Sequence, residues 1–198
     1  MKDAAPVHGM SHPAPAFPAS PPSDWVVRWS HLLAADATVL DVACGAGRHM
    51  QWFAGRGHAV TGVDRSPEAI AAAGAFGRTV VADIEAGPWP FAGQVFGAVV
   101  VTNYLWRARM ADIVAAVAPG GVLLYETFAA GNETVGKPSR ADFLLQPGEL
   151  LAACAGLRVV AYEDGFVQEP ARFVQRIAAV RPAAPAAGEP ERHLLKGN

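Results

Sequence analysis

The sequence predicts an α/β fold in three layers, with helices on both sides of a mostly parallel seven-stranded sheet whose last strand is antiparallel. Short runs rich in β-branched residues alternate with longer amphipathic or alanine-rich stretches, which is typical of repeated strand–helix units. The last two runs have no helix between them, and such neighbours pair antiparallel because parallel strands need a crossover connection. With 198 residues, 52% of them hydrophobic, the chain is long and apolar enough for one domain of this kind.

The predicted strands are the β-branched runs, each bounded by glycine, proline or polar residues. They cover residues 38–42, 58–63, 79–82, 96–102, 122–127, 157–163 and 173–180. Asp164-Gly165 is expected to form the turn between the last two strands. Pro119-Gly120-Gly121 is expected to end the preceding helix just before the fifth strand.

The predicted helices lie between these strands and begin at recognisable caps. Asp24 is expected to cap a first helix, and Ser66 followed by Pro67 opens another. Two further helices are expected over residues 48–55 and 149–155, and one with Ile113, Val114 and Val117 on one side. The apolar face of the first helix would carry Trp25, Val26, Trp29, Leu32 and Leu33.

Both ends of the chain have a different composition from the rest. Residues 1–23 and 181–198 are rich in proline and alanine and poor in large apolar side chains. Such segments bury too little apolar surface to offset the entropy of ordering. We therefore expect a disordered leader, a folded unit over residues 24–180 and a disordered tail.

Charge and cysteine content narrow the class of protein. A net charge of -2 gives no excess of positive charge for neutralising phosphates, so nucleic acid is not the first-choice partner. The two cysteines form no disulfide framework, and no run of 18 uncharged apolar residues occurs. The six histidines lack the clustered spacing of a metal site. We expect a cytoplasmic protein without a metal ion and without a membrane partner.

The segment from Asp41 to Gly47 is an apolar strand end followed by a turn of small residues and a helix start. Small residues let the backbone approach a ligand closely. A dinucleotide-binding turn needs a third glycine where this chain has Met50. A phosphate-binding loop needs lysine and serine or threonine after the last glycine, and here Arg48-His49 follows. The sequence therefore favours neither a dinucleotide-binding turn nor a phosphate-binding loop.

The turn resembles the first motif of the class I S-adenosylmethionine-dependent methyltransferases, which have a Rossmann-like fold. Asp41 matches the acid of that motif, Gly45 and Gly47 match its later glycines, and Ala43 stands where many members have the first glycine. Ala118-Pro119-Gly120-Gly121 before the fifth strand is also similar to the family. The chain compares most readily with small bacterial methyltransferases of the tellurite-resistance-like group.

The resemblance implies S-adenosylmethionine as the cofactor and assigns its contacts. The turn, with Asp41, Ala43, Cys44, Gly45 and Gly47, would seat the methionine portion, although Cys44 also fits a small buried spacer. Asp64, at the end of the second strand, would hold the ribose hydroxyls. Asp83 would bind the adenine amine while Ile84 packs on the ring. All these positions follow strands at the edge where open α/β sheets bind ligands.

Three residues are candidates beside the methyl acceptor. Asn103 and Tyr104 follow the fourth strand, where the family places residues close to the transferred methyl group, and Asn103 would also touch the cofactor. Glu126, at the end of the fifth strand, would position the acceptor or take its proton. The alternative for Glu126 is an ion pair with Arg140 or Lys137. The long polar loop over residues 131–143 is expected to form the acceptor side of the pocket.

The function these observations favour is methyl transfer from S-adenosylmethionine to a small molecule. One alternative is an RNA methyltransferase, for which Arg48, Arg56, Arg107 and Arg109 would supply a basic stripe. Another is a protein that binds the cofactor without catalysis. A nicotinamide-dependent oxidoreductase is a more distant alternative.

Overall fold

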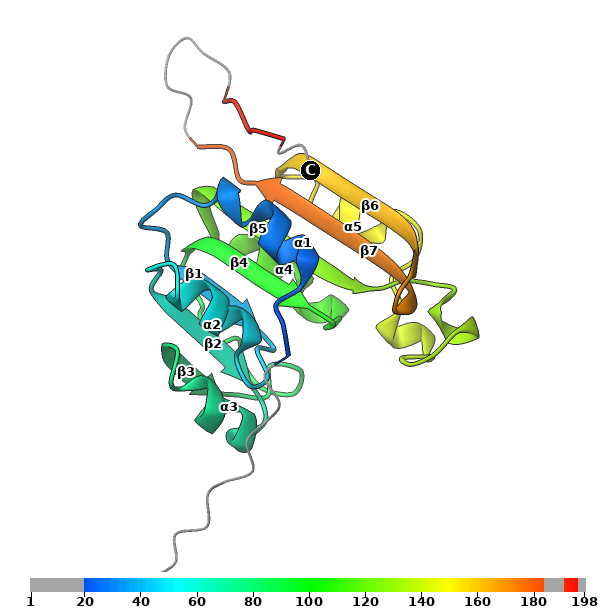
Figure 1. Ribbon diagram of the computed structural model, residues 1–198, viewed down its shortest axis with the longest axis horizontal. Helices are drawn as coiled ribbons and strands as arrows, with labels where there is room; N and C mark the ends of the chain where they lie inside the picture. Colours follow the sequence, from blue (N-terminus) through cyan, green and yellow to red (C-terminus); the bar gives the residue numbers. More distant parts are fainter. Residues whose placement is uncertain (1–19, 184–190, 196–198) are drawn as a thin grey trace, which may run out of the picture.

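The computed structural model describes residues 20–183 and 191–195, and its centre is a seven-stranded sheet in the order β3-β2-β1-β4-β5-β7-β6 (Figure 1). β7 runs antiparallel to both of its neighbours, and the other adjacent pairs are parallel. The predicted fold class is confirmed. The strands are β1 (Val39–Val42), β2 (Val60–Asp64), β3 (Arg78–Val81), β4 (Phe96–Thr102), β5 (Val117–Phe128), β6 (Arg158–Gln168) and β7 (Ala171–Val180).

Helices cover both faces of the sheet, with α1 and α2 in front of it and α4 and α5 behind it in Figure 1. Trp25, Phe53 and Ile70 belong to the core between the first three helices and the sheet, and Ile113 and Leu150 to the core on the opposite face. The α-helices are α1 (Asp24–Trp29), α2 (Arg48–Ala54), α3 (Pro67–Ala73), α4 (Arg107–Ala115) and α5 (Glu149–Ala153). Short 3-10 helices are η1 (Ser30–Leu32), η2 (Asn132–Thr134) and η3 (Ala141–Phe143).

The predicted starts of two helices are correct to within one residue. The Ser66 side chain accepts a hydrogen bond from the backbone N–H of Ala69 and Pro67 follows it, as expected. At α1 the cap is Ser23 rather than Asp24, because the Ser23 hydroxyl oxygen accepts from the backbone N–H of Trp25. Serine and aspartate are equally good caps, so the pattern alone did not separate the two neighbours. Residues 1–19, 184–190 and 196–198, on which most of the leader and tail predictions fall, lie outside the described residues.

The beginning of β5 differs from the prediction. Val117 belongs to this strand and not to the preceding helix, which ends at Ala115. In the ladder with β4, Val117 pairs with Phe96 and Val122 pairs with Ala98, so the register shifts between them. Pro119, Gly120 and Gly121 therefore lie inside β5, at the place where the register shifts, and not before its first residue.

The turn between β6 and β7 also lies away from its predicted place. Asp164 and Gly165 are part of β6 and pair with Gln175 and Val174 of β7. The two residues between the strands are Glu169 and Pro170. Proline has no backbone N–H for the ladder, which makes it the stronger signal for the end of a strand.

Gly62 in β2 allows α2 to pack closely on the sheet, and replacing it with alanine should destabilise the protein. An added Cβ would lie 2.3 Å from the Met50 Sδ atom and 2.8 Å from the Cys44 Sγ atom. Overpacking of this kind costs about 1–3 kcal/mol. Urea denaturation should show the loss for Gly62→Ala. The matched control is Gly165→Ala on β6, where an added Cβ meets nothing within 4 Å. Equal midpoints for both variants would contradict the prediction.

Candidate active site at the carboxyl edge of the sheet

The turn after β1 contains three residues with left-handed backbone. The φ angle is 54° at Ala43, 54° at Gly45 and 85° at Gly47. Glycine adopts this conformation freely, whereas it costs about 1–2 kcal/mol for a residue with a Cβ atom. Ala43 therefore has a conformation that glycine adopts freely, at an energetic cost.

Asp64, the last residue of β2, holds this turn in place. Its Oδ2 atom accepts a hydrogen bond from the backbone N–H of Gly45, and its Oδ1 atom accepts one from Ser66, both at 2.9 Å. An ionised carboxylate has about four acceptor sites, so each oxygen keeps one for a ligand. Asp64 thus shapes the glycine turn and still offers both oxygens.

A cavity of about 210 Å³ lies beside the turn, at the ends of the strands. Five predicted site residues line it, namely Ala43, Asp64, Asp83, Ile84 and Tyr104. The other four lining residues were not predicted: Val63, Arg65, Ala82 and Glu85. The remaining candidates, Asp41, Cys44, Gly45, Gly47, Asn103 and Glu126, are outside the lining of this cavity.

Asp83 is exposed on the cavity rim, and Ile84 beside it is buried. The Asp83 Oδ1 atom accepts hydrogen bonds from the backbone N–H groups of Ala86 and Glu85. These bonds lower the pKa of Asp83, so the side chain is ionised at neutral pH. It is therefore an acceptor next to an apolar surface, which suits a base with an amino group.

Asp41 is a buried carboxylate behind the glycine turn. It is 1% exposed, and among the described residues its Oδ2 atom has no hydrogen-bond partner. Burial raises the pKa of Asp41 to about 7, against the opposing effect of the Arg48 charge. A buried carboxylate oxygen without a partner is costly and fits a cationic ligand group close by.

His49 is a buried polar neighbour of this carboxylate, and its Nδ1 atom lies 3.9 Å from Asp41 Oδ2. Its Nε2 atom accepts a hydrogen bond from the backbone N–H of Ser23 at 3.1 Å. We therefore assign the proton of the neutral ring to Nδ1, which faces Asp41. Burial lowers the pKa of His49 to about 3, so the ring stays neutral at physiological pH. The sequence prediction had missed His49.

Asn103 and Tyr104 follow β4, as predicted. Asn103 has a left-handed φ of 54°, and its backbone N–H donates to the Glu126 carbonyl. The Tyr104 carbonyl accepts from the Tyr125 hydroxyl, which fixes the backbone here. Within the described part of the chain the Tyr104 hydroxyl is buried without a hydrogen-bond partner, and burial raises its pKa. It is the second polar atom of the site that lacks a partner.

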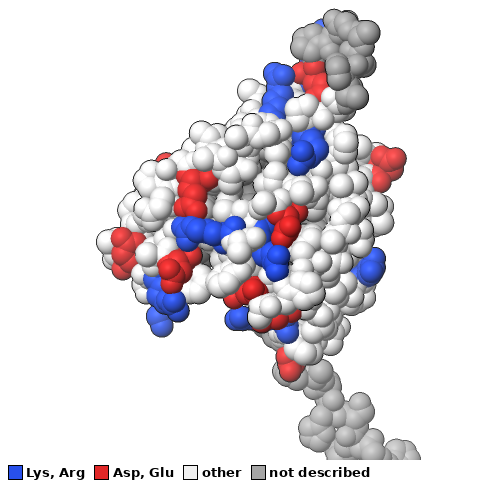
Figure 2. Space-filling model, turned by 180° about the vertical axis from the view of Figure 1, so that it is seen from behind, with Lys and Arg blue, Asp and Glu red and all other residues white. Residues whose placement is uncertain are grey.

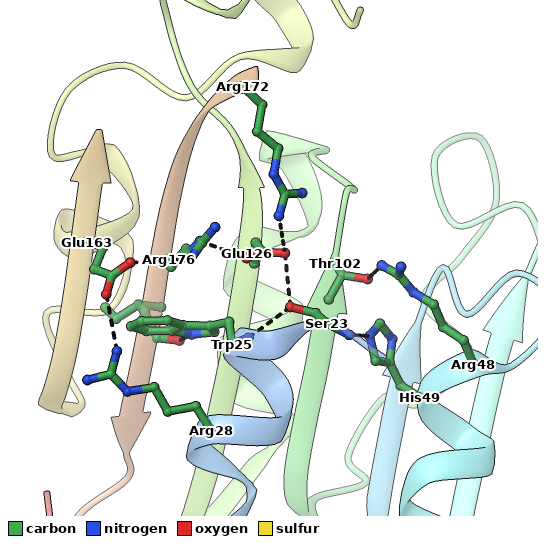
Figure 3. Close-up of polar contacts among 11 residues, drawn as sticks. Ser23, Trp25, Arg28, Arg48, His49, Thr102, Glu126, Glu163, Arg172 and Arg176 are labelled. Carbon is green, nitrogen blue, oxygen red and sulfur yellow. Dashed lines mark hydrogen bonds and ion pairs between the residues drawn. The ribbon is translucent and has the colours of Figure 1, made fainter. Parts of the chain in front are cut away.

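Glu126 is 2% exposed and forms ion pairs with two arginines of β7 (Figure 3). Its Oε2 atom lies 2.8 Å from Arg176 Nε, and its Oε1 atom lies 3.6 Å from Arg172. The Ser23 hydroxyl also donates to Oε1. The alternative that Glu126 pairs with Arg140 or Lys137 is wrong. Arg140 pairs with Asp142 instead.

Two further predictions concern Cys44 and the loop over residues 131–143. Cys44 is buried, and burial raises the pKa of its thiol, so it behaves as a protonated spacer.

The loop over residues 131–143 is anchored by Asn132, whose side chain donates to the Pro138 carbonyl and accepts from the Phe173 backbone N–H. Its role on the acceptor side stays a prediction.

The described residues contain neither a metal-binding cluster nor a membrane-spanning helix. No group of three or more His, Cys, Asp or Glu side chains there could hold a metal ion. No helix in residues 20–183 or 191–195 is long and apolar enough to cross a membrane.

Comparisons with known proteins agree with the observed strand order and glycine turn. The fold is that of the class I S-adenosylmethionine-dependent methyltransferases. Residues 39–121 match the model of a methyltransferase domain family. A methyltransferase domain model therefore matches part of the chain, and the fold predicted from the sequence is confirmed. No curated protein matches the chain.

Three solved structures illustrate the similarity of fold. TehB from Haemophilus influenzae has a TM-score of 0.64 and 20% identity, over 80% of this chain and 61% of that chain. A TehB-like S-adenosylmethionine-dependent methyltransferase from Corynebacterium glutamicum has a TM-score of 0.59 and 21% identity, over 79% of this chain and 86% of that chain. Magnesium protoporphyrin IX methyltransferase from Synechocystis, with bound S-adenosylmethionine, has a TM-score of 0.57 and 15% identity, over 79% of this chain and 74% of that chain.

Proposed function

We propose that this protein transfers the methyl group of S-adenosylmethionine to a small-molecule acceptor. The observation that carries the proposal is a strand-end cavity with two buried polar atoms at or near it. Asp41 Oδ2, behind the turn, and the Tyr104 hydroxyl, in the lining, have no hydrogen-bond partner among the described residues. Such atoms cost about 1–3 kcal/mol each unless a ligand or water completes them. The site is therefore suited to a ligand with several polar groups.

The residues at this edge fit the parts of S-adenosylmethionine. Asp64 would accept from the ribose hydroxyls with the acceptor sites that the backbone leaves free. Asp83 would accept from the adenine amine, and Ile84 would pack against the ring. Asp41 would balance the positive amino-acid end, near the turn of Ala43, Cys44, Gly45 and Gly47. Carboxylates around the turn would repel a diphosphate, which argues against a dinucleotide.

When bound, S-adenosylmethionine supplies an activated methyl group, so the protein mainly has to align the acceptor and exclude water. Asn103 and Tyr104 would form the wall next to the acceptor. For Glu126 we favour positioning over proton transfer. Its carboxylate pairs with Arg176 and Arg172 and accepts a hydrogen bond from the Ser23 hydroxyl, so it already holds three side chains at this edge.

A small acceptor is favoured over RNA because three of the four arginines of the expected basic stripe contact other side chains of the protein. Arg107 pairs with Glu149, Arg109 pairs with Asp112, and Arg56 stacks on Trp52. The face in Figure 2 shows acidic side chains interspersed among the basic ones. We place the activity in the cytoplasm, where the buried thiols of Cys44 and Cys154 would stay reduced.

Calorimetric titration of the whole chain with S-adenosylmethionine and with NAD, side by side, tests the cofactor. We expect binding of S-adenosylmethionine only, and a preference for NAD would overturn the proposal. Formation of S-adenosylhomocysteine with a panel of small acids, thiols, phenols and amines then tests catalysis. Binding without turnover of any of these would favour the alternative of a non-catalytic cofactor-binding protein.

A further inference from the structure

Three guanidinium groups gather where β4 and β5 end and β7 begins, next to the proposed cofactor cavity. Arg172 and Arg176 come from β7, which runs antiparallel and so begins at the edge where β5 ends. Arg48 comes from the first residue of α2. Figure 3 shows Arg48 and Arg172 approaching this edge from different sides, with Thr102, Glu126 and Ser23 between them. The edge is therefore rich in positive charge.

Arg48 has no carboxylate partner among the described residues. Its NH2 atom donates to the Thr102 hydroxyl at 3.2 Å, and its NH1 atom donates to the Pro21 carbonyl at 3.5 Å. Both acceptors are neutral, and the second bond is long. The charge of Arg48 is thus uncompensated by direct contact, although it acts at longer range on Asp41.

The positive charge of Arg172 is only weakly compensated by neighbouring carboxylates. Its contact with Glu126 is 3.6 Å, beyond hydrogen-bond length, while Arg176 lies closer to the same carboxylate at 2.8 Å. The Arg172 side chain is 21% exposed, and within the described residues its Nε atom is buried without a hydrogen-bond partner. Glu163 offers its carboxylate to Arg176 and Arg28, not to Arg172. Arg172 therefore has donors left for an anion.

We infer that the methyl acceptor carries a carboxylate, and that Arg48 and Arg172 hold it. This inference rests on the proposed methyl transfer. Guanidinium groups present planar pairs of donors that match a carboxylate, and charge-assisted bonds of this kind are strong. A singly charged carboxylate fits better than a doubly charged phosphate, because the Asp41 and Glu126 carboxylates occupy the same edge.

The test uses the full-length protein loaded with S-adenosylhomocysteine for binding and with S-adenosylmethionine for turnover. The probes are small aromatic and aliphatic carboxylic acids, each paired with its carboxamide and with the matching phosphate ester. We expect calorimetric binding and turnover of at least one acid, and neither for its amide. Arg172→Gln and Arg48→Gln should each lower kcat/KM for that acid about 10- to 100-fold, mainly through KM.

Two controls separate recognition from folding and from cofactor binding. Arg158→Gln removes the same charge from an exposed position of β6 and should leave kcat/KM unchanged. Affinity for S-adenosylmethionine should stay within about twofold in Arg172→Gln and Arg158→Gln, because we assign neither arginine to the cofactor. Arg48→Gln should bind S-adenosylmethionine more weakly as well, since the Arg48 charge favours the ionised form of Asp41. If Arg172→Gln fails to fold, Arg172→Lys keeps the charge without the planar fork and should give a smaller loss.

Several outcomes would overturn the inference. These are equal use of an acid and its amide, a preference for the phosphate ester, an equal effect of Arg172→Gln and Arg158→Gln, and no binding of any acid in the panel. Failure of the wild-type protein to bind S-adenosylmethionine would be a different result, because it would contradict the proposed function itself.

Discussion

Asp64→Ala is expected to reduce the affinity for S-adenosylmethionine by at least about 100-fold, since two charge-assisted hydrogen bonds to a ligand are lost. The substitution also removes the acceptor for the backbone N–H groups of Gly45 and Ser66. The glycine turn would then lose the contact that fixes its conformation. Calorimetric titration of the variant with S-adenosylmethionine measures the combined effect.

Two further variants separate these contributions. Asp64→Asn keeps one side-chain oxygen but not both, so its affinity should lie between those of Asp64→Ala and the wild type. Glu85→Ala changes a carboxylate in the same cavity that forms a long ion pair with Arg65, at 3.9 Å. The affinity of Glu85→Ala for S-adenosylmethionine should lie within a few-fold of that of the wild type. Unchanged affinity in Asp64→Ala would show that the cofactor does not rest on this carboxylate.

Asp41→Asn is expected to remove a pH dependence of stability. The pKa of Asp41 is raised from 3.8 to about 7 in the folded protein, so between these values the folded state holds a proton that the unfolded state has released. The stabilising contribution is therefore complete below about pH 4 and is lost as pH rises towards 7. A shift of this size corresponds to roughly 4 kcal/mol as an upper estimate.

Urea denaturation at about pH 5 and about pH 8 measures this effect. The wild type should lose more stability than Asp41→Asn on going to the higher pH. The charged and titratable neighbours that act on Asp41 are Arg48, Asp64 and His49. Burial lowers the pKa of His49 from 6.5 to about 3, so only the unfolded state takes up this proton as pH falls below about 6.5. Its contribution to stability rises with pH, opposite in sign to that of Asp41, and is common to the wild type and Asp41→Asn. A parallel pH dependence in the variant would contradict the prediction.

The same carboxylate should couple cofactor binding to pH. A positive amino group near Asp41 favours its ionised form, so the affinity of the wild type for S-adenosylmethionine should rise between about pH 6 and 8. Calorimetry near pH 6.5 in two buffers of different ionisation enthalpy should detect proton release on binding. In Asp41→Asn the proton release from this side chain should vanish, and the affinity for S-adenosylmethionine should be lower than in the wild type.

Much of the fold follows from local signals in the sequence. The β-branched run over residues 96–102 coincides with β4, and Ser66 caps α3 as expected. The errors arose where glycine or proline lies inside a strand, at Gly120 and Gly121 in β5 and at Gly165 in β6. There the pairing with neighbouring strands outweighs the local turn preference, and a single sequence does not reveal that pairing.

The candidate site divides in a similar way. Asp64 and Asp83 could be placed because each directly follows a strand, and strand ends meet at one edge of the sheet. The partners of Glu126 could not be found from spacing along the chain. Arg176 lies opposite Glu126 only because of the register between β5 and β7. The predicted antiparallel hairpin was the available signal, since it brings the first residues of β7 to the carboxyl edge.

The antiparallel course of β7 has a consequence for how such a protein diversifies. The residues that line the proposed cofactor cavity lie between Ala43 and Tyr104, inside the segment that matches a methyltransferase domain, whereas Arg172 and Arg176 belong to a hairpin near the other end of the chain. On the proposal that Arg172 holds the acceptor, substitutions in that hairpin would alter the choice of molecule to be modified and leave the cofactor site intact. Descendants of one ancestral gene could thus acquire new substrates through changes in a short stretch of sequence.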